Sequence, residues 1–113
     1  MEPVIPAQAL CRLDDIPDNE AIAVDIRIDD ELDNVILLRR GNDVRAYFNV
    51  CPHAGRRLDW APGKFLVKDG VLICAAHGAS FQAESGVCIG GPCRGDRLRA
   101  VSVAVSGEDV VLA

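Results

Sequence analysis

Short runs of apolar residues, many of them alternating with polar ones, recur along the chain and are separated by turn residues. Residues 21–28, 35–40 and 44–50 are rich in β-branched and other apolar residues, a composition and pattern typical of β-strands. Gly41 and Asn42 between the last two predict a two-residue hairpin turn, because both residue types tolerate a positive φ. The acidic segment at residues 29–34 is expected to be a loop.

The second half of the chain has the same character. Strands are predicted at residues 71–73, 98–105 and 110–112, with turns at residues 68–70, 84–86 and 106–109. Helical periodicity is weak, and a short helical turn is expected only at residues 5–10. The pattern therefore predicts an all-β sandwich or small barrel that forms a single domain over residues 1–113.

Composition narrows the possible partners and the location. Half of the residues are apolar, so 113 residues suffice for one real core. A formal net charge of −5 argues against binding nucleic acid or an anionic membrane. We expect a cytoplasmic protein, because no run of about 18 apolar residues occurs and the start lacks a basic segment followed by an apolar one. In a reducing cytoplasm, five cysteines indicate metal binding rather than a disulfide framework.

The candidate chemistry lies in two cysteine–histidine pairs. Cys51 and His53 form one pair, Cys74 and His77 form the other, and these are the only two histidines of the chain. Each pair follows a predicted strand and is followed by a glycine, so each is placed in a loop whose base is fixed. A single such pair would carry little weight, but two matching pairs predict a metal or cluster site.

Two thiolates and two imidazoles suit either of two metal centres. They fit a tetrahedral zinc ion, and they fit a [2Fe–2S] cluster in which two cysteines hold one iron and two histidines the other. Each loop here supplies one cysteine and one histidine, whereas zinc fingers usually separate the two residue types. This distribution favours the cluster, and a structural zinc domain is the alternative.

The two loops resemble the sequence boxes of Rieske [2Fe–2S] proteins. "CPHAGRRL" at residues 51–58 is similar to the first box, "CAAHGASF" at residues 74–81 to the second, and "GGPC" at residues 90–93 to the loop that covers the cluster. The resemblance implies a three-sheet antiparallel β fold with two cluster-binding loops at one tip. It also implies that Cys51 and Cys74 bind the inner iron, and that His53 and His77 bind the outer, more exposed iron.

The function implied by this resemblance is one-electron transfer, as in the small Rieske-type ferredoxins of oxygenase systems. The expected partners are a reductase and a terminal oxygenase or similar enzyme, without nucleic acid or membrane. The alternative is a small redox subunit or sensor module of a larger reductase complex. A self-contained oxygenase is excluded, since it would need a second iron site with two further histidines.

The second box also predicts a low reduction potential. High-potential Rieske proteins carry a serine and a tyrosine whose hydroxyls donate hydrogen bonds to sulfur, and an additional cysteine in each box. Here the two hydroxyl positions hold Ala79 and Phe81, neither box has an additional cysteine, and Ser80 is displaced by one residue. Loss of these donors destabilises the reduced, more negative cluster, so the potential is expected near the negative end of the Rieske range, roughly −150 to +300 mV.

The remaining features are less specific. Twenty residues separate His53 from Cys74, and "DWAPGK" at residues 59–64 is expected to hold an insertion relative to small Rieske ferredoxins. Trp60 in it is interpreted as a packing anchor under the loop, with a partner contact as the alternative. For Arg56 and Arg57, surface charge and docking of an acidic partner both remain open.

Three cysteines lie outside the boxes. Cys88 and Cys93 flank the "IGGP" segment and Cys11 lies far upstream. All three are interpreted as buried thiols, and a disulfide between Cys88 and Cys93 is the alternative.

Overall fold

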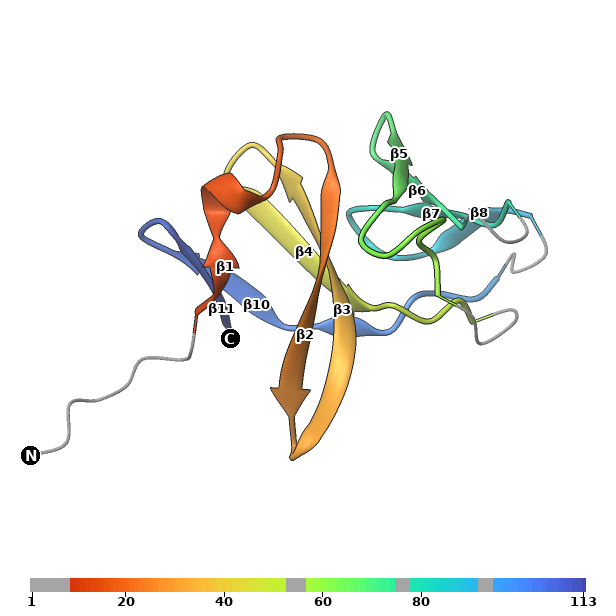
Figure 1. Ribbon diagram of the computed structural model, residues 1–113. Coiled ribbons are helices and arrows are strands. Elements are labelled where there is room, and N and C mark those ends of the chain that lie inside the picture. Colours follow the sequence, from red (N-terminus) through yellow and green to blue (C-terminus); the bar gives the residue numbers. More distant parts are fainter. Residues whose placement is uncertain (1–8, 53–56, 75–77, 92–94) are drawn as a thin grey trace, which may run out of the picture.

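The computed structural model describes residues 9–52, 57–74, 78–91 and 95–113. Its strands form three antiparallel sheets, as predicted, with one short 3-10 turn, η1 (Leu13–Asp15) (Figure 1). The first sheet has the order β1-β11-β10, with bounds Ala9–Arg12, Asp109–Leu112 and Val103–Ser106. The second has the order β2-β3-β4-β9, with bounds Ala21–Ile28, Glu31–Arg40, Asp43–Phe48 and Ala100–Val101. The third has the order β5-β6-β7-β8, with bounds Leu66–Lys68, Val71–Ile73, Ser80–Gln82 and Cys88–Gly90.

The β2–β3 hairpin is longer than the sequence pattern predicts. Residues 31–34 pair with β2 instead of forming a loop, and only Asp29 and Asp30 make the turn. Both turn residues have a positive φ, 50° and 65°, which aspartate tolerates better than most residues and which suits a two-residue hairpin. The loop expected at residues 29–34 is therefore wrong beyond its first two residues.

The N-terminal segment is a strand where it is described. Residues 5–8 of the expected helical turn lie outside the described residues, but Ala9 and Leu10 belong to β1. β1 pairs with β11, so long-range pairing overrides a weak local preference for helix. The single strand expected at residues 98–105 is divided into β9 and β10, which belong to different sheets.

Successive residues of β3 face two different hydrophobic cores. Val35 and Leu37 lie in the base core, formed with Leu13, Ile16, Ile26, Val44, Ala46 and Val110. Ile36 and Leu38 lie in the loop-side core, formed with Tyr47, Cys51, Leu58, Leu72, Cys74, Ala79, Phe81, Ala83, Cys88 and Leu98. Because side chains alternate across a strand, β3 is a wall shared by both cores.

A transmembrane helix is absent from the part of the chain that the structure describes, where no helix reaches the necessary length and hydropathy.

Candidate metal centre

Both cysteines of the predicted ligand set are buried at strand ends. Cys51 lies three residues beyond the end of β4, and Cys74 directly follows β6. Each is 0% exposed, and both belong to the loop-side core. His53 and His77 lie outside the described residues, so their role as ligands stays a prediction. Two buried sulfur atoms in one cluster of side chains fit the inner, cysteine-bound iron of a Rieske site.

The second loop is closed tightly at its base. The Cys74 amide donates to the carbonyl of Ala79 at 2.7 Å, and the Gly78 amide donates to the carbonyl of Cys74 at 2.9 Å. Gly78 has a φ of +74°, which glycine adopts without steric cost. These bonds fix the backbone on both sides of the second predicted iron ligand pair.

Side chains that follow this loop carry no hydroxyl into the buried interior. Ala79 and Phe81 are both 0% exposed. The Ser80 hydroxyl donates instead to the carbonyl of Gly78, at 3.4 Å. The described second box therefore has no serine or tyrosine hydroxyl at the two positions used for sulfur hydrogen bonds.

A buried asparagine closes the first loop, and sequence analysis missed it. Asn49 is 2% exposed, and its side-chain oxygen accepts a hydrogen bond from the Leu58 amide at 2.8 Å. Its own backbone amide donates to the carbonyl of Asn34 at 3.0 Å. The signal in the sequence was a polar residue at the end of an apolar strand, directly before the first box.

Asn49 also joins the first loop to the β2–β3 hairpin and to Asp59. Its side-chain amide donates to Asn34 Oδ1 at 2.8 Å and, at 3.4 Å, to Asp59 Oδ1. Asn34 in turn donates to Asp25 Oδ1 at 2.9 Å. A continuous hydrogen-bonded chain thus runs from the surface of β2 to the segment that follows the first box.

Arg57 braces this segment through a bidentate pair with Asp59. The guanidinium donates from Nε at 3.0 Å and from Nη2 at 2.7 Å, and the Gly63 amide donates to Asp59 Oδ2 at 3.0 Å. The Asp59 side chain is only 3% exposed. The hydrogen bonds from Arg57, ahead of those from Gly63 and Asn49, lower the pKa of Asp59, although its burial acts in the opposite direction.

Residues 59–64, where an insertion was expected, are held by backbone hydrogen bonds rather than by Trp60. The Trp60 amide donates to the carbonyl of Lys64 at 2.9 Å, and the Lys64 amide donates to the carbonyl of Ala61 at 2.8 Å. The Trp60 side chain itself is 59% exposed. The interpretation of Trp60 as a packing anchor is therefore wrong. The largely buried side chain of Asp59, bonded to Arg57 and Gly63, holds this segment instead.

Gly91 brings the third predicted loop against the second. Gly91 has a φ of +86°, and a Cβ placed there would lie 2.9 Å from the Cα of Ala79 and 3.1 Å from the carbonyl oxygen of Gly78. Only glycine permits so close an approach of two backbones. This contact agrees with a covering role for residues 90–93, of which Pro92 and Cys93 lie outside the described residues.

Tyr47 connects the second sheet to the sheet that carries the second box. Its hydroxyl donates to the carbonyl of Ala83 at 2.7 Å, in the connection between β7 and β8. Gly86 lies against the ring, where a Cβ would come within 2.7 Å of it. Burial is the main cause that raises the pKa of Tyr47. The phenol therefore remains a neutral donor that fixes the two sheets relative to each other.

The cysteines outside the boxes differ from one another. Cys11 is partly buried in β1, and burial, followed by the charges of Asp15 and Asp109, raises the pKa of its thiol. Cys88 is disulfide-bonded, so its interpretation as a buried thiol is wrong. Cys93 lies outside the described residues.

Comparison with known proteins identifies the family. The model of the Rieske [2Fe-2S] domain matches residues 7–112. This chain belongs to the Rieske [2Fe–2S] family. Members of the family carry one Rieske-type cluster, so the cofactor expected from the two boxes is confirmed at the level of the family.

Related proteins include ferredoxins of oxygenase systems. The ferredoxin component of an alkene monooxygenase system from Xanthobacter autotrophicus is 35% identical over 77 residues, which are 68% of this chain and 57% of that protein. This chain therefore spans less than two thirds of the length of that relative. The ferredoxin of carbazole 1,9a-dioxygenase from Nocardioides aromaticivorans matches with a TM-score of 0.73 and 27% identity, over 95% of this chain and 96% of that one.

A second solved structure supports the fold. A chain in the complex of reduced oxygenase and oxidized ferredoxin in carbazole 1,9a-dioxygenase matches with a TM-score of 0.74 and 20% identity, over 94% of this chain and 91% of that chain. The all-β Rieske fold expected from the resemblance is confirmed.

Proposed function

We propose that this chain is a one-electron carrier that passes electrons from a reductase to an oxygenase. The observation that carries the proposal is the pair of fully buried cysteines, Cys51 and Cys74, in the loop-side core of a chain of the Rieske family. Two relatives are ferredoxins of a monooxygenase system and of a dioxygenase, and the structure of the second has the same fold as this chain. The chain itself is proposed to form a single domain without substrate turnover of its own.

Four residues are proposed to bind the cluster. Cys51 and Cys74 bind the inner iron and His53 and His77 the outer iron, in agreement with the burial of both cysteines. When bound, the cluster accepts and releases one electron, and the protein sets its potential through ligand type, hydrogen bonding and burial. The buried, hydroxyl-free side chains of Ala79 and Phe81 support a potential near the negative end of the Rieske range.

The test begins with the purified protein as isolated. We expect a red-brown protein with two irons and two sulfides per chain, and the EPR spectrum typical of a reduced Rieske cluster. Cys51→Ser and Cys74→Ser are expected to abolish this spectrum, whereas Cys11→Ser, in a free thiol away from the boxes, leaves it unchanged. A colourless protein with one bound zinc would overturn the cluster assignment.

The carrier role needs a separate measurement. The protein is reduced by a flavin reductase with NADH and then mixed with an oxidised Rieske oxygenase, and the absorbance of both clusters is followed. Single-electron transfer at a rate compatible with turnover supports the proposal, and a cluster that is never oxidised by any oxygenase favours a sensor role. The cytoplasmic location stays a prediction, which cell fractionation checks.

A further inference from the structure

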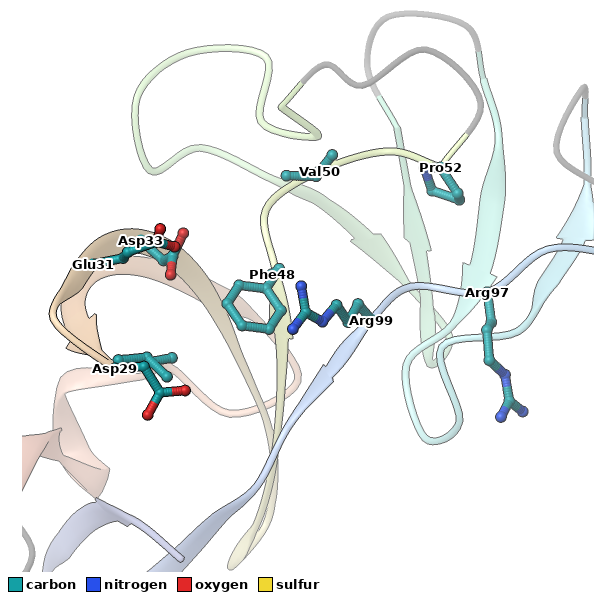
Figure 2. A pocket seen from close by; sticks show the side chains of 9 residues that line it. Asp29, Glu31, Asp33, Phe48, Val50, Pro52, Arg97 and Arg99 are labelled. Carbon is teal, nitrogen blue, oxygen red and sulfur yellow. The ribbon is translucent and has the colours of Figure 1, made fainter.

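A groove of about 350 Å³ lies beside the first box, between the β2–β3 hairpin, the end of β4 and the segment before β9 (Figure 2). Pro52, which stands between the predicted ligands Cys51 and His53, forms part of its lining. The groove is therefore continuous with the loop proposed to hold the cluster. Anything seated in it therefore lies next to the first box.

One side of the groove is acidic. Asp29, Glu31 and Asp33 line it from the tip of the hairpin, and Figure 2 shows them gathered on that side. Within the described residues, none of the three carboxylates takes part in a salt bridge or a side-chain hydrogen bond. The hairpin thus presents three negative charges that the described part of the chain does not neutralise.

The floor of the groove is apolar. Phe48, Val50 and Pro52 form it, and Val50 is 51% exposed. The guanidinium carbon of Arg99 lies 4.6 Å from the centre of the Phe48 ring, a cation–π contact that holds this charge against the floor. An apolar floor beside carboxylates suits a side chain with an aliphatic stem and a cationic head.

The opposite end of the groove carries the other arginine. Arg97 lines it, and Figure 2 shows its side chain directed away from the three carboxylates. The charges are therefore separated along the groove, with the negative end at the hairpin. Such a separation fixes the orientation of a charged partner more than it adds affinity.

We propose that this groove is a docking site for a protruding loop of the redox partner, and that it receives a lysine or arginine side chain of that loop against Asp29, Glu31 and Asp33. The proposal rests on the proposed carrier function. The three unneutralised carboxylates supply the charge complementarity, and Pro52 places the seated loop next to the cluster-binding loop. The negative net charge of the chain adds steering of a basic surface toward it.

The test uses oxidised cytochrome c as a defined basic redox protein. Reduced holoprotein gives one electron to the ferric haem, which becomes ferrous, and stopped-flow absorbance follows the second-order rate. Glu31→Lys with Asp33→Lys reverses two charges of the groove. Glu20→Lys with Glu84→Lys makes the same change of net charge at exposed sites that do not line the groove.

At low ionic strength the groove variant is expected to react roughly tenfold more slowly with cytochrome c, and the control variant at most about threefold more slowly. The difference should fade as salt screens the charges over about 10 Å at 0.1 M. Anionic ferricyanide serves as the second acceptor, and neither variant should be oxidised by it more slowly than the wild type. If both variants react equally slowly with cytochrome c, net charge alone explains the effect, and the groove is not the docking site.

A second readout does not depend on the rate. Carbodiimide joins a carboxylate to a lysine amine in contact with it, and trypsin releases the hairpin as the peptide of residues 28–39. Cross-links to cytochrome c are expected in this peptide, and they are expected to be lost when Asp29→Asn, Glu31→Gln and Asp33→Asn are combined. Cross-links that favour the peptides with Glu20 or Glu84 instead would overturn the proposal. A reduced wild-type protein that transfers electrons to neither acceptor would instead sink the carrier function.

Discussion

The side-chain oxygen of Asn49 accepts a hydrogen bond from the backbone amide of Leu58, across the base of the loop that holds the first box. One side chain thus connects the residue before the loop to the residue that ends it. Because Asn49 is almost completely buried, no solvent is available to replace this contact. The geometry of the first loop therefore depends on a residue outside the box itself.

Asn49→Ala is expected to destabilise the protein by about 1–3 kcal/mol, since the Leu58 amide is left buried without an acceptor. It should also speed the loss of visible absorbance when the holoprotein is incubated with a chelator. Asn42→Ala, at an exposed hairpin turn, is the matched control and should change neither quantity. Retention of wild-type stability in Asn49→Ala would show that the loop closes without this bond.

Asp59 gives a specific dependence on pH. Its pKa is lowered in the folded state, so its contribution to stability is present above the unfolded pKa, about 4, and is lost as the pH falls through the folded pKa. Asp59→Asn should therefore be less stable than the wild type at pH 7, and the difference should shrink as the pH falls below about 4. Melting temperatures at several pH values, with Asp96→Asn as an exposed control, measure this. A constant difference at all pH values would contradict the assignment.

Hydroxyls restored to the second box should raise the midpoint potential. Ala79→Ser and Phe81→Tyr are expected to raise it together on the order of 50–100 mV, because charge-assisted donors stabilise the reduced cluster and 59 mV corresponds to a factor of ten for one electron. Ser80→Ala is the control, since this hydroxyl donates to the Gly78 carbonyl. A redox titration monitored by circular dichroism gives the midpoint potentials of the wild type, the double variant and Ser80→Ala. A larger shift of the midpoint potential in Ser80→Ala than in the double variant would contradict the role assigned to positions 79 and 81.

Gly91→Ala separates the strain of a positive φ from a clash between loops. The added Cβ would lie 2.9 Å from the Cα of Ala79, so overpacking of about 1–3 kcal/mol adds to the backbone cost. Gly107 also has a positive φ, +62°, but a Cβ there would meet no atom within 4 Å, so Gly107→Ala carries the backbone cost alone. Denaturant titration of both variants should place Gly91→Ala well below Gly107→Ala. Equal stabilities would mean that the third loop moves aside freely.

The parts that the sequence predicts well are those with local signals. Residues 21–28 alternate and form β2 as expected, and Gly41 sits at the turn with a φ of +62°. The two boxes identify the family because their residue spacing is dictated by ligand chemistry. These features can be predicted without knowing which residues pack against them.

The parts that were missed depend on contacts between distant segments. Residues 31–34 read as an acidic loop, yet pairing with β2 extends the strand through them. Asn49 was predicted only as a polar residue near the end of a strand, and its importance comes from Leu58 and Asn34, 9 and 15 positions away. Trp60 was interpreted as a packing anchor but is 59% exposed, whereas the side chain of Asp59 beside it is only 3% exposed. Hydrophobicity alone does not show which of two neighbouring side chains is buried.

The two faces of β3 have a consequence for any attempt to divide this protein. Val35 and Leu37 belong to the base core, and Ile36 and Leu38 belong to the loop-side core. Removal of β3 would therefore expose both cores to solvent. A fragment that begins after β4 would keep both boxes but lose Ile36 and Leu38, which belong to the core under the cluster-binding loops. Amide hydrogens of β3 should exchange with deuterium only through global unfolding, and the iron-binding end should melt together with the rest of the molecule.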